Sequence, residues 1–180
     1  MYEDMEEKLK SLDLKEIIGY AIGSEEAAGN FYWMIVKVFE PNDLVKHKFE
    51  SIARDEELHM RALLNLHEDA FGDRNYHVPD GLPPFESVAE VERVESLIEA
   101  LNIAMENEMS ANKVYTFLAS QHREHRKLFR YLAQTEMGHY NVLKEEKGFF
   151  DEEVGGQQEY GKLSVKEAYR SPMFKTMDVQ

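Results

Sequence analysis

The chain has 180 residues, no cysteine and a net charge of −14, from 35 acidic and 21 basic side chains. This length is enough for one domain with a real core, and the lack of cysteine excludes disulfides, thiolate metal sites and thiol redox chemistry. The negative charge disfavours nucleic acid and anionic membranes as partners, because both would repel the surface. The acidic start at Met1 resembles no signal peptide, and no window approaches the roughly 20 apolar residues of a membrane span. We therefore expect a cytoplasmic protein.

Apolar residues recur with a helical period through most of the chain. The charged residues 1–10 predict a short helical arm. Four longer helices are expected, over about residues 12–39, 43–69, 87–121 and 124–147. One long stretch, at about residues 71–86, lacks the period, and its three prolines forbid a helix. The chain shows no strand-like alternation, so the predicted fold class is all-α.

The helices predict one domain and an extension. A four-helix bundle is expected over residues 1–147, and residues 148–180 form a C-terminal extension. The extension is expected to be loose and acidic over 148–160, with a short helix that begins at Ser164 and stops before Pro172. The first long helix contains three glycines, Gly19, Gly23 and Gly29. Each lowers the helix propensity by about 1 kcal/mol, which indicates either close approach of another helix or local flexibility.

The strongest chemical signal is a repeated Glu-x-x-His motif. It occurs from Glu56 to His59 and again from Glu136 to His139, each time with an alanine three residues before the glutamate and a leucine after the histidine. Residues i and i+3 lie on one face of a helix, about 5–6 Å apart at Cβ. A glutamate and a histidine at this spacing can hold one metal ion between them. One such pair often arises by chance, but two pairs in matching contexts are much stronger evidence.

The other two helices each carry a single glutamate in a shared context. Glu25 and Glu108 each lie between two alanines and are followed seven residues later by a tyrosine, Tyr32 or Tyr115. The chain is therefore an internal duplication of a two-helix unit, a single-glutamate helix followed by a Glu-x-x-His helix. Each tyrosine lies two turns beyond its glutamate on the same face. We expect its hydroxyl to hydrogen-bond a ligand carboxylate of the other hairpin, with a purely packing role as the alternative.

The spacing places these four helix segments at one level of a bundle. Within each hairpin, the two glutamates lie equally far from the turn that joins their helices, about 20 Å away at about 1.5 Å per residue. The irregular stretch of about 16 residues can span up to about 50 Å. It can therefore return the chain along the bundle, which gives the one-crossover topology of ferritin-like bundles. Two antiparallel hairpins then deliver four carboxylates and two imidazoles to one depth.

This ligand set indicates which metals the site would hold. Four carboxylates and two imidazoles suit iron or manganese, whereas zinc prefers fewer ligands in a tetrahedral site and calcium uses oxygen ligands alone. The same set shared by two ions leaves open positions for O₂ or peroxide, as in the di-iron carboxylate proteins. Fe/Fe and Fe/Mn centres are both compatible with it. A metal-free bundle is disfavoured, because burying four carboxylates without cations is very costly.

These motifs, in this order over about residues 12–147, resemble the rubrerythrin-type members of the ferritin-like family. The resemblance implies a di-iron four-helix bundle, often a homodimer, that reacts with hydrogen peroxide or O₂. It assigns the ligand places for two Fe ions to Glu25, Glu56, His59, Glu108, Glu136 and His139. It also implies that Glu56 and Glu136 bridge the two ions.

The chain departs from that family in two ways. Rubrerythrins proper carry a cysteine-ligated rubredoxin-like module, and this chain has no cysteine, so turnover would need an external electron donor. They also have a further glutamate three residues after the ligand that corresponds to Glu108, where this chain has Ala111. In that family, this glutamate goes with a change of metal ligand on oxidation or reduction and with a preference for peroxide. The resemblance therefore does not imply either property for this chain.

Three functions are compatible with these residues. The first is a di-iron peroxidase, oxidase or ferroxidase, which the duplicated Glu-x-x-His motif favours. The second is an iron storage or carrier protein without redox turnover, and the third is a bundle in which metal is only a structural staple. The five remaining histidines match no repeated position and are predicted as surface or capping residues. They are His47, His67, His77, His122 and His125.

Overall fold

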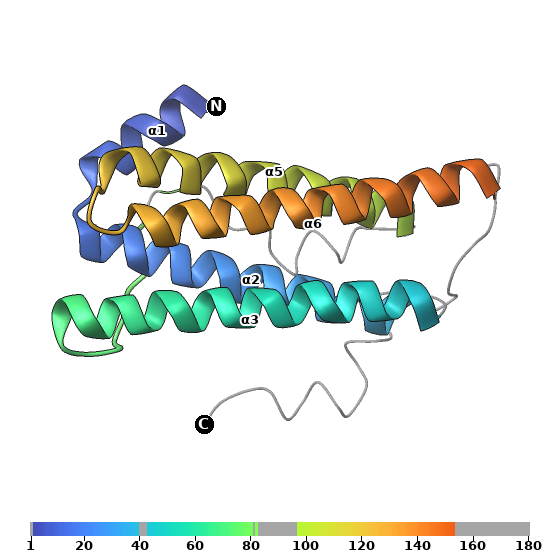
Figure 1. Ribbon diagram of the computed structural model, residues 1–180, viewed down its shortest axis with the longest axis horizontal. Coiled ribbons are helices and arrows are strands. Elements are labelled where there is room, and N and C mark those ends of the chain that lie inside the picture. Colours follow the sequence, from blue (N-terminus) through green and yellow to red (C-terminus); the bar gives the residue numbers. More distant parts are fainter. Residues whose placement is uncertain (1, 40–42, 81, 83–96, 154–180) are drawn as a thin grey trace.

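The computed structural model describes residues 2–39, 43–80, 82 and 97–153, and shows only helices and their connections among them. The helices are α1 (Tyr2–Ser11), α2 (Leu14–Phe39), α3 (Asp43–Phe71), α5 (Leu97–Gln121) and α6 (Arg126–Glu153). The four long helices lie side by side in a bundle (Figure 1). The predicted all-α four-helix bundle is thereby confirmed.

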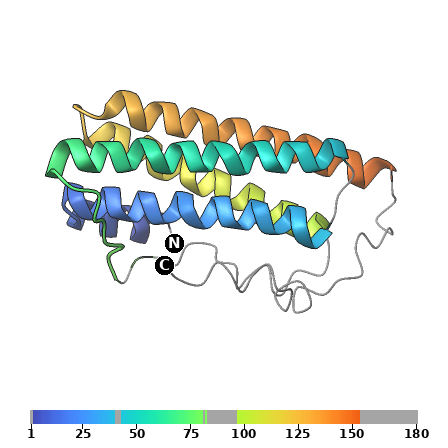
Figure 2. The same cartoon turned by 90° about the horizontal axis from the view of Figure 1, so that it is seen from below.

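The four long helices form two antiparallel hairpins. α2 pairs with α3, and α5 pairs with α6. α5 begins at the same end of the bundle as α3 and runs parallel to it, as both views show (Figures 1 and 2). The chain therefore returns along the bundle between the hairpins, as the length of the irregular stretch predicted. α1 lies at the end that carries the α5–α6 turn, where Lys10 Nζ is 5.6 Å from the centre of the Phe117 ring.

Local capping chemistry sets two of the helix ends. At the start of α2, Glu16 N–H donates to Asp13 Oδ1 and Asp13 N–H donates to Glu16 Oε2, both at 2.9 Å. This reciprocal capping box satisfies two backbone donors. α3 ends at Phe71, before Gly72, whose φ of 81° only glycine adopts readily and whose N–H donates to the carbonyl of Glu68 at 2.8 Å.

The predicted end of the fourth helix is wrong. α6 continues to Glu153 and does not stop at residue 147, so residues 148–153 are helical where a loose stretch was expected. The reason is that Gly148 costs a helix only about 1 kcal/mol, which by itself does not end one. The expected helix start at Ser87 and the expected short helix from Ser164 lie outside the described residues.

The apolar core consists of two clusters of buried residues. One includes Phe31, Ile35 and Phe49 and extends to Leu97 and the residues that follow it on α5. The other includes Ile18, Leu63, Leu118, Phe129 and Leu132. The buried glutamates and histidines of the repeated motifs belong to neither cluster. The bundle therefore holds a polar layer in its interior.

The glycines of α2 give a prediction about stability. A Cβ added at Gly19 would lie 2.2 Å from the backbone carbonyl oxygen of His77, whereas one at Gly29 would lie 3.6 Å from Glu56 Cβ, an ordinary contact. Gly19 thus allows a loop, and not a helix, to approach α2. We expect Gly19→Ala to lower the free energy of unfolding by about 1–3 kcal/mol through overpacking. Gly29→Ala should raise it by up to about 1 kcal/mol through helix propensity.

Chemical denaturation of both variants tests this difference. Gly29→Ala is the matched control, because both glycines lie inside α2 and the substitution is the same. Equal stability of the two variants would show that the backbone at His77 does not pack on Gly19.

Candidate metal centre

The structure brings all six predicted ligand residues together in the polar layer. Each hairpin contributes three of them, one glutamate from its first helix and the Glu-x-x-His pair from its second. No member of the set is more than 5% exposed; they are Glu25, Glu56, His59, Glu108, Glu136 and His139. Four helices thus deliver four carboxyl groups and two imidazoles to one buried site.

The six residues form two overlapping donor sets. One contains Glu25, Glu56, His59 and Glu136, and the other contains Glu56, Glu108, Glu136 and His139. Within each set, one donor atom from every residue lies within 4.8 Å of the others. Each set has three carboxyl groups and one imidazole, and the two sets share Glu56 and Glu136. The arrangement fits two neighbouring cations that share two carboxylates.

Distances to the histidine rings show how the shared carboxylates are placed. Glu56 has one oxygen 3.1 Å from His59 Nδ1 and the other 2.9 Å from His139 Nδ1. Glu136 has one oxygen 3.1 Å from His59 Nδ1 and the other 3.6 Å from His139 Nδ1. Each of these carboxylates therefore presents one oxygen toward each histidine. The two rings lie 5.8 Å apart, centre to centre.

Each unshared carboxyl group is held by a tyrosine from the opposite hairpin. Tyr32 Oη on α2 donates to Glu108 Oε1 on α5, and Tyr115 Oη on α5 donates to Glu25 Oε1 on α2. The predicted hydrogen bonds between hairpins are confirmed. The second oxygen of each group faces the histidine of its own set, at 3.2 Å from His59 Nδ1 for Glu25 and 3.4 Å from His139 Nδ1 for Glu108.

Several buried polar atoms of the cluster have no hydrogen-bond partner in the described structure. They are Glu56 Oε1, Glu108 Oε2, Glu136 Oε1, His59 Nε2 and both ring nitrogens of His139. Buried polar groups are normally hydrogen-bonded, because leaving one unpaired is costly. Glu56 Oε1 and Glu108 Oε2 lie beside His139 Nδ1 in one donor set, whereas Glu136 Oε1 lies beside His59 in the other. One cation in each set would satisfy these atoms, so the residues fit the metal that the sequence predicts.

Electrostatics separates the carboxyl groups into two kinds. Burial raises the pKa of Glu25 well above its usual value, and the neighbouring Glu136 and Glu56 carboxylates raise it further. Burial and the Glu56 carboxylate raise the pKa of Glu108 in the same way. Burial alone would also raise the pKa of Glu56 and Glu136, but their contacts with both histidines outweigh it and lower the pKa of each. Without metal, the shared carboxylates stay ionised and the unshared ones hold protons more readily.

The histidines balance those charges when metal is absent. Burial would lower the pKa of His59, but close contacts with three carboxylates, with Glu136 the largest contributor, raise that pKa to about 12. The pKa of His139 is raised for the same reason, with Glu108 the largest contributor. Both imidazoles are therefore cationic at neutral pH in the metal-free protein. Because a metal ligand must be a neutral imidazole, binding must release these protons.

Two further residues contact the cluster and are not among the residues predicted from the motifs. Asp55 Oδ2 lies 3.5 Å from His139 Nε2, and its side chain is 45% exposed. The ring of Tyr131, which is 58% exposed, lies edge-on to His59 at 6.2 Å between ring centres. The only sign in the sequence is that Asp55 directly precedes Glu56. Nothing in the motif distinguishes Asp55 from other acidic residues at the surface.

The predictions for the remaining histidines are mostly confirmed. His47 and His77 are exposed, and His122 and His125 are partly buried beside the α5–α6 turn. His67 is the exception, since it is fully buried and not at the surface. Its Nδ1 lies 2.6 Å from the carbonyl oxygen of Asp73, just beyond the end of α3, and its ring packs against Phe71. It therefore ties the segment that follows α3 back to the helix.

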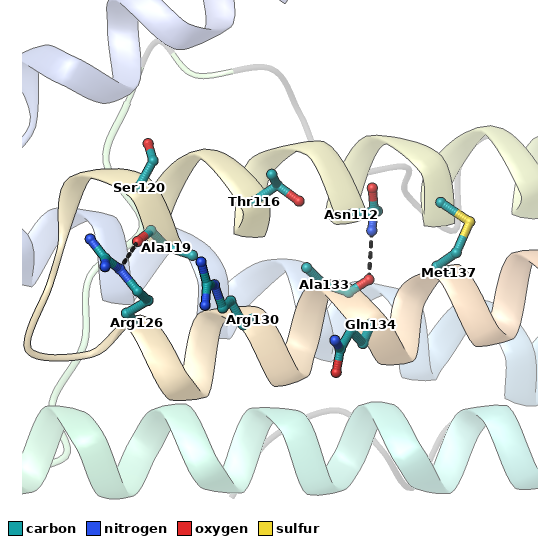
Figure 3. Close-up of a pocket in the computed structure, with 9 residues that line it drawn as sticks. All are labelled: Asn112, Thr116, Ala119, Ser120, Arg126, Arg130, Ala133, Gln134 and Met137. Atoms are coloured by element: carbon teal, nitrogen blue, oxygen red, sulfur yellow. Dashed lines mark hydrogen bonds between the residues drawn. The ribbon is translucent and has the colours of Figure 1, made fainter.

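A groove of about 700 Å³ opens between α5 and α6 (Figure 3). Its lining residues are Asn112, Thr116, Ala119, Ser120, Arg126, Arg130, Ala133, Gln134 and Met137. Asn112 Nδ2 donates to the carbonyl of Ala133, and Arg126 Nε donates to the carbonyl of Ala119. These two side chains tie the hairpin together along the groove. None of the six cluster residues lines it, so the groove is separate from the candidate metal centre.

Fold and site together define a four-helix bundle with a buried glutamate and histidine cluster that could hold metal. The family model of rubrerythrin matches residues 16–147. The chain therefore belongs to the rubrerythrin family, a ferritin-like di-iron family.

Other comparisons agree with this fold. A solved structure of a hypothetical protein from Pyrococcus furiosus is similar, with a TM-score of 0.67 and 28% sequence identity over 80% of this chain and 94% of that one. No curated protein matches the chain significantly. Among the described residues, no helix is long and apolar enough to cross a membrane.

Proposed function

We propose that the protein is a di-iron oxidoreductase that reduces hydrogen peroxide or O₂ and oxidises Fe²⁺ in the same reaction. The observation that carries this proposal is the pair of overlapping donor sets that share Glu56 and Glu136. Each ion would have three carboxylates and one imidazole, a ligand set that suits iron or manganese. When bound, two ferrous ions would supply the two electrons that reduce one peroxide molecule, with two protons, to two molecules of water.

The residues of the chain would prepare the site for this reaction. Glu25 and His59 would hold one ion, Glu108 and His139 would hold the other, and Glu56 and Glu136 would contribute to both. Tyr32 and Tyr115 fix the unshared carboxyl groups by hydrogen bonds between the hairpins. These hydrogen bonds would hold the carboxyl groups in the orientation that metal binding needs. The two apolar clusters keep bulk water from the buried layer.

Electrons must come from outside the chain. The sequence contains no cysteine and so has no cysteine-ligated iron centre of its own. We infer that an external one-electron donor re-reduces the oxidised centre twice for each peroxide consumed. A protein mixed with peroxide in the absence of a donor would therefore be oxidised once and stop.

Stopped-flow mixing of the anaerobic, ferrous-loaded protein with each oxidant tests the proposal. We expect one rapid phase of near-ultraviolet absorption with peroxide, and a phase with O₂, each amounting to about two iron oxidised per chain. Glu106→Ala is the matched control, because Glu106 is an exposed residue of α5 near Glu108 and lies outside both donor sets. It should react like the wild type. If neither oxidant reacts within minutes, the redox proposal is wrong, and a non-redox iron storage or carrier role replaces it.

A further inference from the structure

The internal duplication allows the two metal positions to be compared residue by residue. Residues of α3 and α6 correspond at a constant spacing of 80, so that Glu56 matches Glu136 and His59 matches His139. Both donor sets contain three carboxyl groups and one imidazole. The ligands themselves therefore give no reason for the two positions to differ. A difference in metal affinity between the two positions would come from residues outside the donor sets that surround the two histidines.

Those residues are different. Asp55 lies 3.5 Å from Nε2 of His139 through its Oδ2 atom. The position that corresponds to Asp55 in the other half is Thr135, whose hydroxyl donates to the backbone carbonyl of Tyr131 at 3.1 Å. Nε2 of His59 and Nε2 of His139 are both buried and form no hydrogen bond in the described structure. Among the described residues, only His139 has a carboxylate at ion-pair distance from this nitrogen, which faces away from the donor set.

The outer surroundings differ as well. The ring of Tyr131 lies against His59, whereas the corresponding residue of the other half is the small and exposed Ser51. One side of the centre thus has an aromatic ring behind its histidine, and the other has a negative charge. A carboxylate close to a ligand imidazole raises the basicity of that imidazole and fixes its orientation. It also attracts a divalent cation in its own right.

We propose that the two metal positions are unequal, and that Asp55 makes the position at His139 the tighter one and the first to fill. Asp55 is a positioning residue in this proposal, since it acts through His139 and does not itself lie in either donor set. The inference rests on the proposed di-metal centre and goes beyond it by assigning an order of loading. Loss of an outer partner of this kind typically weakens metal binding about 10–100-fold.

Titration of the metal-free protein with Co²⁺, followed by calorimetry and visible absorption, tests the inference without any enzymatic assay. We expect two binding steps. Asp55→Asn should weaken the first step by about 10–100-fold and leave the second nearly unchanged. Thr135→Asp, which gives His59 the same partner, should strengthen the second step. Asp69→Asn, at an exposed position of α3 outside both donor sets, is the control and should leave both steps unchanged.

Two steps alone would not prove the point, because a first cation repels a second even when the positions are equal. A crystal grown with one equivalent of Co²⁺ identifies the first position directly. We expect the stronger anomalous signal beside His139. A stronger signal beside His59, or affinities that Asp55→Asn and Thr135→Asp leave unchanged, would overturn the inference. Failure of the wild type to bind Co²⁺ at all would instead overturn the di-metal centre.

Discussion

Replacing Glu56 with alanine is expected to reduce the metal content from two ions per chain to one or none. Glu56 presents one oxygen toward each histidine and belongs to both donor sets, so its loss removes a ligand from both positions. Loss of a residue that only supports a ligand costs about 10–100-fold in affinity. The loss of a shared ligand should therefore cost more than about 100-fold.

Elemental analysis after equilibration with Fe²⁺ under anaerobic conditions measures this effect. Glu57→Ala is the matched control, because the neighbouring Glu57 lies on the same helix but bonds to Trp33 Nε1 at 3.2 Å and belongs to neither donor set. It should retain both ions. Circular dichroism of the metal-free variants shows whether the bundle is intact. A folded Glu56→Ala protein that keeps two ions at wild-type affinity would show that the ligand assignment is wrong.

The six cluster residues could be predicted from the sequence because the motif occurs twice, and each copy supports the interpretation of the other. A single Glu-x-x-His is common by chance, but the second copy repeats its alanine and leucine neighbours as well as its two polar residues. Within each hairpin, the two glutamates lie equally far from the turn, so their side chains must lie at the same level of the bundle. The tyrosines followed from the same logic, since Tyr32 and Tyr115 lie at one offset from Glu25 and Glu108.

The contacts that the sequence did not reveal depend on how the helices rotate against one another. Asp55 reaches His139 across the α3–α6 interface, and Tyr131 reaches His59 across the same interface. Both side chains are about half exposed, so their pattern resembles that of ordinary surface residues. The same holds for the buried His67, since only the path of the backbone around Asp73 places a carbonyl beside its ring. Helical periodicity gives the face of a residue but not the partner that packs there.

Removing the metal is expected to lower the melting temperature at pH 7 by more than about 8 °C. A ligand present at about 1,000 times its dissociation constant stabilises a protein by about 4 kcal/mol, and about 1 kcal/mol shifts the melting temperature of a domain of this size by about 2–4 °C. The second ion adds to this effect. Metal-free protein that melts at the temperature of the loaded form would indicate that the cluster does not bind metal.

The same experiment repeated across pH tests the charges of the metal-free cluster, and the direction follows from the pKa shifts. The pKa of His59 is raised from 6.5 to about 12, so its contribution to stability is complete below pH 6.5 and is lost as the pH rises toward 12. The pKa values of Glu25 and Glu108 are also raised. Their contribution to stability is therefore complete below the unfolded pKa of 4.5 and is lost as the pH rises. Glu56 has a lowered pKa, so its contribution is lost only as the pH falls below 4.5.

The metal-free protein should therefore become more stable as the pH falls from 8 toward about 5, and the loaded protein should not, because ions replace those protons. Melting curves of both forms at several pH values measure the difference. Glu25→Gln is the informative variant, since glutamine keeps the shape of the protonated carboxyl group and can still accept from Tyr115. It should raise the melting temperature of the metal-free protein at pH 8 and weaken its dependence on pH. A metal-free wild type whose stability increases steadily from pH 5 to 8 would show that the buried carboxyl groups do not repel one another as the structure requires.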